Sequence, residues 1–247
     1  MHADGYFDEH VAGTYDDPTD AANHASTIAP IVDLLAELAG NGPALEFAIG
    51  TGRIALPLTQ RGVEVHGIDR SQAMVDRLRA KPGGATIPVT IGDIATTQVD
   101  GAGSFTLVYL VFNTIMNLTT QAAQVACFRN AGAHLSPGGR FVIEVGIPDL
   151  RRLPPGDVHR APYDVSPTTW SIDEYDVAHQ GLISHHMEVV DGRLDRVSIP
   201  FRYVWPAELD LMAEVAGLRP RDRWATWTRT PFTSDSEAHV SVWERPR

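Results

Sequence analysis

The chain contains 247 residues, of which 43% are hydrophobic and 21% are charged, a composition typical of a globular protein large enough to bury a core. The net charge of −11 disfavours a phosphate-backbone partner, so we expect no nucleic acid to bind. No apolar stretch approaches the roughly 20 residues of a membrane span, and residues 1–5 do not resemble the start of a signal peptide, so we expect no membrane association and a cytoplasmic location.

The first 40 residues predict a helical segment that precedes the main fold. Tyr15 lies among acidic residues, and residues 21–39 carry isoleucine and leucine at helical spacing before Asn41-Gly42-Pro43 ends the helix. We expect residues 1–40 to form a lid over the rest of the chain.

A glycine turn follows the first apolar run, in Ala44-Leu45-Glu46-Phe47-Ala48-Ile49-Gly50-Thr51-Gly52-Arg53. A helical pattern begins directly behind it, so this stretch predicts a strand, a tight turn and a helix N-terminus, where the backbone can approach a nucleotide closely. Two signatures fit these residues. Gly50-x-Gly52-x-x-Ala55 matches the dinucleotide fingerprint. Glu46-x-Ala48-x-Gly50-x-Gly52 matches the acid-x-Gly-x-Gly-x-Gly signature of class I S-adenosylmethionine (SAM) methyltransferases, with Ala48 in place of the first glycine.

Strands and helices then alternate up to residue 145. We expect strands at residues 44–49, 63–69, 87–91, 105–112 and 141–145, with helices between them. Pro88 cannot donate to a sheet ladder, so the third strand belongs at an edge. The fourth strand is apolar almost throughout, as a central parallel strand should be. The alternation predicts an α/β fold with a doubly wound, Rossmann-like sheet.

The pattern changes after Gly146. Prolines mark a long connection, and three segments of alternating polarity follow at residues 170–177, 182–190 and 194–203. We interpret residues 146–204 as an antiparallel β insertion over the C-terminal edge of the sheet, where ligands bind in such folds. A helix from Pro206 and two strands at 223–227 and 239–243 complete what we expect to be a single domain spanning residues 1–247.

Acidic residues at the strand ends distinguish the two candidate ligands. Asp69 can accept hydrogen bonds from ribose hydroxyls of either ligand, so it does not discriminate. Asp93 can accept from an adenine amino group, while the Ile94 N–H can serve a ring nitrogen. Glu46 favours a cationic sulfonium ligand with an α-amino group and would repel a pyrophosphate. These residues favour SAM over NAD.

Four stretches carry a family resemblance: Leu45-Glu46-Phe47-Ala48-Ile49-Gly50-Thr51-Gly52-Arg53, Gly67-Ile68-Asp69-Arg70-Ser71, Gly92-Asp93-Ile94 and Leu135-Ser136-Pro137-Gly138-Gly139-Arg140. They look like successive motifs of class I SAM-dependent methyltransferases. Within that class the layout resembles bacterial small-molecule enzymes, including sugar N,N-dimethyltransferases, which also carry an antiparallel insertion after the fifth strand. The resemblance implies seven strands in the order 3-2-1-4-5-7-6 with strand 7 antiparallel. It also implies SAM as cofactor and S-adenosylhomocysteine (SAH) as product.

The same resemblance implies further cofactor contacts. The Leu110 region would contact the methionine or adenosine end, Met74 or Arg70 would flank the adenine, and Tyr15 would cover the methionine part. The expected cofactor site comprises Tyr15, Glu46, Ala48, Gly50, Gly52, Arg53, Asp69, Arg70, Met74, Asp93, Ile94 and Leu110. No metal is expected.

Candidate substrate residues follow the fourth and fifth strands. Asn113 and Glu144 lie at or just beyond the strand ends, where substrate contacts gather. Asn117 stands where the related sugar enzymes have a histidine, and an asparagine can orient a substrate but cannot take its proton. His185 is the candidate base, beside the simpler interpretation of a histidine packed in the core. A base is needed only if the nucleophile arrives protonated, because in-line positioning can supply much of the catalysis.

We therefore expect a SAM-dependent methyltransferase that acts on a nitrogen or oxygen atom of a small molecule in secondary metabolism, and a homodimer is compatible with the sequence. One alternative is an NAD-dependent oxidoreductase, which Glu46 and Asp93 disfavour. The other is a SAM-binding partner subunit without turnover, which the lack of a clear base keeps open.

Overall fold

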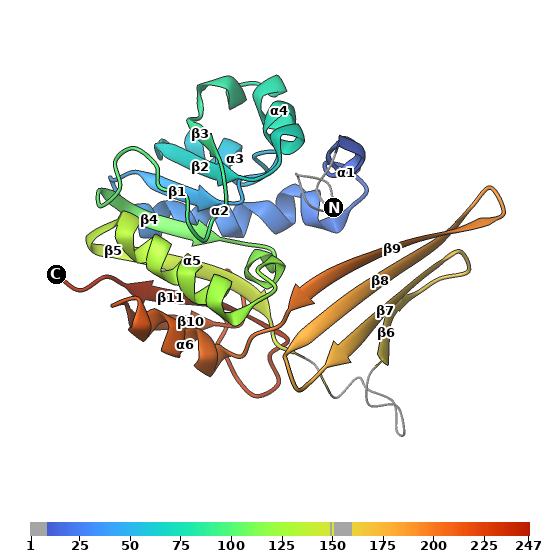
Figure 1. The fold of residues 1–247 in the computed structure, drawn as a ribbon. Helices are drawn as coiled ribbons and strands as arrows, with labels where there is room; N and C mark the ends of the chain where they lie inside the picture. Colours follow the sequence, from blue (N-terminus) through green and yellow to red (C-terminus); the bar gives the residue numbers. More distant parts are fainter. Residues whose placement is uncertain (1–8, 149, 151–159) are drawn as a thin grey trace.

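A computed structural model describes residues 9–148, 150 and 160–247 of the chain. A seven-stranded sheet lies between two layers of helices, and a four-stranded antiparallel sheet projects from one end of it (Figure 1). The strands of the first sheet are β1 (Ala44–Phe47), β2 (Val65–Asp69), β3 (Val89–Ile91), β4 (Phe105–Leu110), β5 (Leu135–Gly146), β10 (Arg219–Trp224) and β11 (Ala238–Glu244). Those of the second are β6 (Arg160–Val165), β7 (Thr169–Asp176), β8 (Gly181–Val190) and β9 (Arg193–Arg202).

The seven-stranded sheet runs in the order β3-β2-β1-β4-β5-β11-β10. Strands β1 to β5 pair in parallel, whereas β11 is antiparallel to both β5 and β10. This is the predicted order 3-2-1-4-5-7-6 with strand 7 antiparallel, so the predicted fold class is confirmed. β3 lies at an edge, as Pro88 required.

Each face of this sheet is covered by helices that bury apolar side chains against it. These helices are α2 (Ala25–Ala39), α3 (Ala55–Gln60), α4 (Gln72–Ala80), α5 (Gln121–His134) and α6 (Pro206–Val215), and the short α1 (Glu9–Thr14) packs against α4. One core cluster joins the sheet to α2, α3 and Leu78 of α4, and a second joins the opposite face to α5 and α6. The strands are held between two cores, which explains their near-continuous apolar sequences.

The structure corrects two predictions about strands. The strand expected at residues 223–227 is β10 at Arg219–Trp224, because an exposed edge strand needs no apolar alternation to pair with β11. The insertion also has a fourth strand, β6, in a segment expected to be a connection. β6 carries Pro162 beside a register irregularity, and its position at the sheet edge tolerates that proline.

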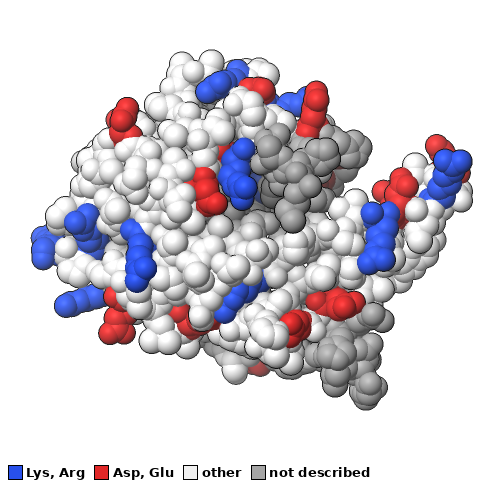
Figure 2. All heavy atoms as spheres, viewed as in Figure 1, with Lys and Arg blue, Asp and Glu red and all other residues white. Residues whose placement is uncertain are grey.

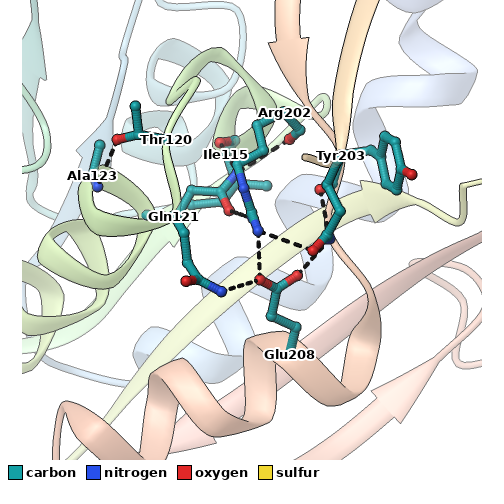
Figure 3. Close-up of polar contacts among 9 residues, drawn as sticks. Ile115, Thr120, Gln121, Ala123, Arg202, Tyr203 and Glu208 are labelled. Atoms are coloured by element: carbon teal, nitrogen blue, oxygen red, sulfur yellow. Dashed lines mark hydrogen bonds and ion pairs between the residues drawn. The ribbon is translucent and has the colours of Figure 1, made fainter. Parts of the chain in front are cut away.

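A buried polar cluster attaches the base of the projecting sheet to the helices (Figure 3). Arg202, at the end of β9, donates to Glu208 of α6 at 2.7 Å and also to the side chains of Gln124 and Gln180. Burial alone would raise the Glu208 pKa, but hydrogen bonds from Arg202, Gln180 and Gln121 outweigh it and hold the pKa below its usual value. The cluster fixes where the four-stranded sheet leaves the body.

Charges of both signs are interspersed on the described part of the face shown in Figure 2, including the tip of the β8–β9 hairpin. Among the residues that the structure describes, no helix is both long enough and apolar enough to span a bilayer.

Candidate functional site

The turn after β1 uses three left-handed residues to bring backbone to the C-terminal edge of the sheet. Ala48, Gly50 and Gly52 have φ values of 57°, 55° and 78°. A Cβ on Gly52 would lie 2.3 Å from a methyl carbon of Leu78, so this position needs glycine for space as well as for conformation. Ala48 adopts a conformation that glycine takes more readily, which is consistent with its place at a motif glycine.

Asp69 ties the end of β2 to this turn. Its Oδ2 accepts a hydrogen bond from the Gly50 N–H at 2.6 Å, and its Oδ1 accepts from the Ser71 N–H at 2.8 Å. Burial raises the pKa of this carboxyl, although the backbone hydrogen bonds oppose the shift. Each carboxylate oxygen has a second lone pair, so Asp69 can still accept from a ribose hydroxyl.

Glu46 is buried in the middle of β1, next to Tyr109 in the β1–β4 register. The Tyr109 hydroxyl donates to Oε2 of Glu46 at 2.8 Å. Desolvation raises the pKa of Glu46 to about 8, against the opposing effects of the Tyr109 hydrogen bond and the charge of Arg53. Glu46 is therefore mostly protonated at neutral pH, and a cationic ligand group beside it would favour its ionisation.

Arg53 lies at the start of the following helical turn, close to two aromatic rings. Its guanidinium carbon is 3.7 Å from the centroid of the Phe112 ring and 5.2 Å from that of Tyr15. Its terminal nitrogens donate to Oδ1 of Asn23 at 3.2 Å and to the Tyr15 hydroxyl at 3.4 Å. A guanidinium carries five N–H donors, so it keeps donors for an anionic ligand group.

The segment that follows α1 is bound by polar contacts to the glycine turn and to the residue after α4. Asp16 accepts a hydrogen bond from the Thr51 hydroxyl at 2.6 Å and forms an ion pair with Lys81 at 2.8 Å. The Lys81 ammonium also donates to the Thr51 carbonyl at 2.8 Å. A pocket of about 240 Å³ lies beside these contacts. It is lined by Asp16, Asn23, Ile28, Gly52, Arg53, Leu56, Pro57 and Lys81. The lid expected from residues 1–40 stays a prediction.

The predicted adenine residues gather beyond β2 and β3. Arg70 and Asp93 face each other at 3.8 Å, and Asp93 also accepts from the Ala95 N–H at 2.8 Å. Ile94 is buried, and its carbonyl accepts from Asn130 at 2.8 Å. Met74 is buried beside Gly50, and Leu110 is buried at the end of β4. Their arrangement supports the predicted adenine-binding region, while their ligand contacts stay predictions.

The predicted substrate residues lie in the tight turn after β4 and at the end of β5. Asn113 accepts from the Gly146 N–H at 2.6 Å, and Asn117 ends the short 3-10 helix Thr114–Asn117 in a half-buried position. Glu144 accepts from the Phe112 N–H at 3.0 Å and from the Trp227 indole at 2.8 Å.

His185 is in the projecting sheet, and its polar partners belong to that sheet. Its Nδ1 lies 2.8 Å from the Ser198 hydroxyl and 3.0 Å from a nitrogen of Arg196, and its Nε2 lies 3.7 Å from a carboxylate oxygen of Glu174. The structure does not bring His185 to the glycine turn after β1. His185 as a base stays a prediction that this geometry does not favour.

Phe112, Asn23, Lys81 and Trp227 contribute to this region but were not predicted as site residues. Only tertiary contacts reveal them: Phe112 stacks on Arg53, and Trp227 reaches Glu144 from the β10–β11 loop. For Phe112, the only sequence signal was its position at the end of the expected central strand.

Comparisons with known proteins agree with this geometry. Residues 44–139 match the model of a methyltransferase domain family. The chain is similar over its whole length to the CcbJ methyltransferase from Streptomyces caelestis, with 32% identity, 100% of both chains covered and a TM-score of 0.87. It is 25% identical over 233 residues to a cypemycin N-terminal methyltransferase from Streptomyces sp, covering 90% of this chain and 92% of that protein.

A more distant structural neighbour shares the fold. SAM-bound CalS10, an amino pentose methyltransferase from Micromonospora echinaspora, is 18% identical, with 99% of this chain and 100% of that chain covered and a TM-score of 0.66.

Proposed function

The chain belongs to the SAM-dependent methyltransferase family, and we propose that it transfers the methyl group of SAM to a nitrogen or oxygen atom of a small molecule in secondary metabolism. The observation that carries the proposal is the convergence of the glycine turn, Asp69 and Arg53 at the C-terminal edge of β1 and β2. Parallel α/β sheets bind ligands at this edge.

The residues present fit SAM in both shape and charge. The left-handed Gly50 and Gly52 hold side-chain-free backbone at the sheet edge, and Asp69 has lone pairs free for ribose hydroxyls. We assign Arg53 to the methionine carboxylate, because a planar guanidinium matches a carboxylate with two parallel hydrogen bonds. We assign Asp93 and Ile94 to the adenine edge, and Met74 to its face.

Bound SAM supplies an electrophilic methyl group on a sulfonium. The protein's contribution to the transfer is to hold an acceptor lone pair in line with that methyl, which requires a rigid edge more than an acid or a base. We assign Asn113 and Asn117 to orienting the acceptor, and neither can remove a proton. A neutral amine needs no base before attack, because it can lose its proton after the new bond forms.

An amine is therefore the first acceptor to test. His185 is engaged within the projecting sheet, and His239 is fully buried with its Nδ1 at 2.7 Å from the Ser241 hydroxyl. One similar protein is described as an N-terminal methyltransferase, a name that agrees with transfer to nitrogen. A hydroxyl acceptor remains the second choice. A partner subunit that binds SAM without turnover is the non-enzymatic alternative.

Calorimetry with SAH and NADH tests the cofactor assignment. Wild-type protein should bind SAH and not NADH, and Asp69→Ala should lose SAH binding while Asp100→Ala, which removes an exposed carboxylate before β4, should not. Incubation with SAM and a panel of amines and hydroxyl compounds, followed by mass spectrometry, should then give singly or multiply methylated amines. SAH binding without methylation of any panel member would favour the silent subunit, and binding of NADH alone would refute the proposal.

A further inference from the structure

Two consecutive residues after β4 have left-handed backbones although neither is glycine. Phe112 has φ 55° and Asn113 has φ 60°. Asparagine tolerates this region, but a bulky aromatic residue rarely adopts it, at a cost of about 1–3 kcal/mol. Such strain persists only where surrounding contacts enforce it, so the contacts of Phe112 show what the turn is built to do.

Two hydrogen bonds from β5 hold this turn. Oε2 of Glu144 accepts from the Phe112 N–H at 3.0 Å, and the Gly146 N–H donates to Oδ1 of Asn113 at 2.6 Å. Oε1 of Glu144 accepts from the Trp227 indole N–H at 2.8 Å. Both oxygens of one carboxylate are thus used, one on the strained turn and the other on the β10–β11 loop.

The turn places the Phe112 ring against the guanidinium of Arg53. The 3.7 Å between the guanidinium carbon and the ring centroid is a close cation–π contact, which fixes the plane of the guanidinium. Asn23 and Tyr15 accept hydrogen bonds from its terminal nitrogens and restrict it further. Without the left-handed turn, Arg53 would lose the surface on which it rests.

We propose that Glu144 is a positioning residue for the cofactor. It acts through Phe112 on Arg53, while the Trp227 indole holds the second oxygen of the Glu144 carboxylate. The inference rests on the proposed role of Arg53 in binding SAM. It differs from the predicted substrate contact of Glu144, because it gives this carboxylate a task that its two hydrogen bonds already perform.

The double use of the carboxylate gives a specific test with SAH as the probe. In Glu144→Gln one oxygen becomes an amide donor, which must face either the Phe112 N–H or the Trp227 indole. We expect SAH affinity to fall about tenfold, the scale of a lost cation–π contact. Trp227→Phe should change it less than about threefold. In the double variant the amide can turn toward the vacated indole position and leave its oxygen for Phe112, so affinity should recover to within about threefold of wild type.

Phe112→Leu provides a second route that leaves the Glu144 hydrogen bond in place. It should also weaken SAH binding about tenfold, and combining it with Glu144→Gln should add less than about threefold, because both variants disrupt one contact. Glu188→Gln, on an exposed glutamate of β8, is the matched control and should bind as wild type. All measurements are made at a temperature where circular dichroism shows every variant folded.

Unchanged affinity in Glu144→Gln or in Phe112→Leu would overturn the inference, as would additive effects of Glu144→Gln and Trp227→Phe. Wild-type protein that does not bind SAH would instead refute the proposed function itself, so the two failures are distinguishable.

Discussion

The buried Glu46 predicts an unusual pH dependence of stability for the ligand-free protein. In the unfolded chain its carboxyl should ionise near the ordinary value of 4.5, whereas burial keeps it protonated up to a pKa of about 8 in the folded chain. Between these values the folded state binds one more proton than the unfolded state. The free energy of unfolding should therefore decrease as the pH rises.

The magnitude follows from the size of this window. One pH unit inside it corresponds to about 1.36 kcal/mol. Between pH 5.5 and 7.5, both within the window, Glu46 should remove about 3 kcal/mol of stability, or about 6–12 °C in Tm for a chain of this size. Four groups around Glu46 also act on its pKa. The Tyr109 hydroxyl, the Arg53 guanidinium and the Ala55 N–H lower it, and the Asp69 carboxyl raises it.

Glu46→Gln isolates this contribution, because the amide oxygen can still accept from Tyr109 but cannot ionise. Urea denaturation of both proteins at several pH values between 5.5 and 7.5 measures it. The free energy of unfolding of Glu46→Gln minus that of wild type should increase by about 1.4 kcal/mol per pH unit.

The acid side provides an internal check. Burial lowers the pKa of His239 from 6.5 to about 4, with the charge of Arg223 adding to the effect. Below pH 6.5 the unfolded chain binds that proton and the folded chain does not, so this group alone makes stability decrease as the pH falls toward 4. In wild type the two slopes oppose each other between about 4.5 and 6.5, and Glu46→Gln should remove the Glu46 slope while leaving that of His239 in place. A difference between the two proteins that does not change with pH would refute the reasoning.

Three further predictions concern stability. Arg202→Met should cost about 3–5 kcal/mol in urea denaturation, because it leaves the partly buried Glu208 carboxylate without its guanidinium, and a loss below about 1 kcal/mol would contradict this. Ala48→Gly should stabilise the protein by about 1 kcal/mol, because it relieves a left-handed alanine, and a lowered Tm would show that the turn is not strained there. Gly52→Ala should destabilise by about 1–3 kcal/mol, since its Cβ would meet Leu78 in a left-handed conformation, and a folded variant with wild-type Tm would contradict the close approach.

Fold class and cofactor could be predicted from short segments of the sequence. The glycine turn follows β1, Asp69 ends β2 and Asp93 lies two residues beyond β3, and parallel strands place their C-terminal ends along one edge. Local order was therefore sufficient to predict that these residues converge. The edge position of β3 followed in the same way from one residue, because Pro88 lacks a backbone donor.

The roles of Glu144 and His185 depended on contacts between distant segments. A carboxylate at the end of β5 suggested a substrate contact. The partners of this Glu144 carboxylate come from the turn after β4 and from Trp227, which lies 83 positions further along the chain. The position of His185 depends on the direction in which the four-stranded sheet projects, and the Arg202 cluster sets that direction. Alternating polarity in a strand carries no information about where its sheet projects. The sequence by itself determined the alternation of strands and helices and the ligand edge, because these follow from neighbouring residues, whereas the full strand order was what the family resemblance implied. Only the tertiary structure decided which side chains meet there, because packing joins groups that no local pattern connects.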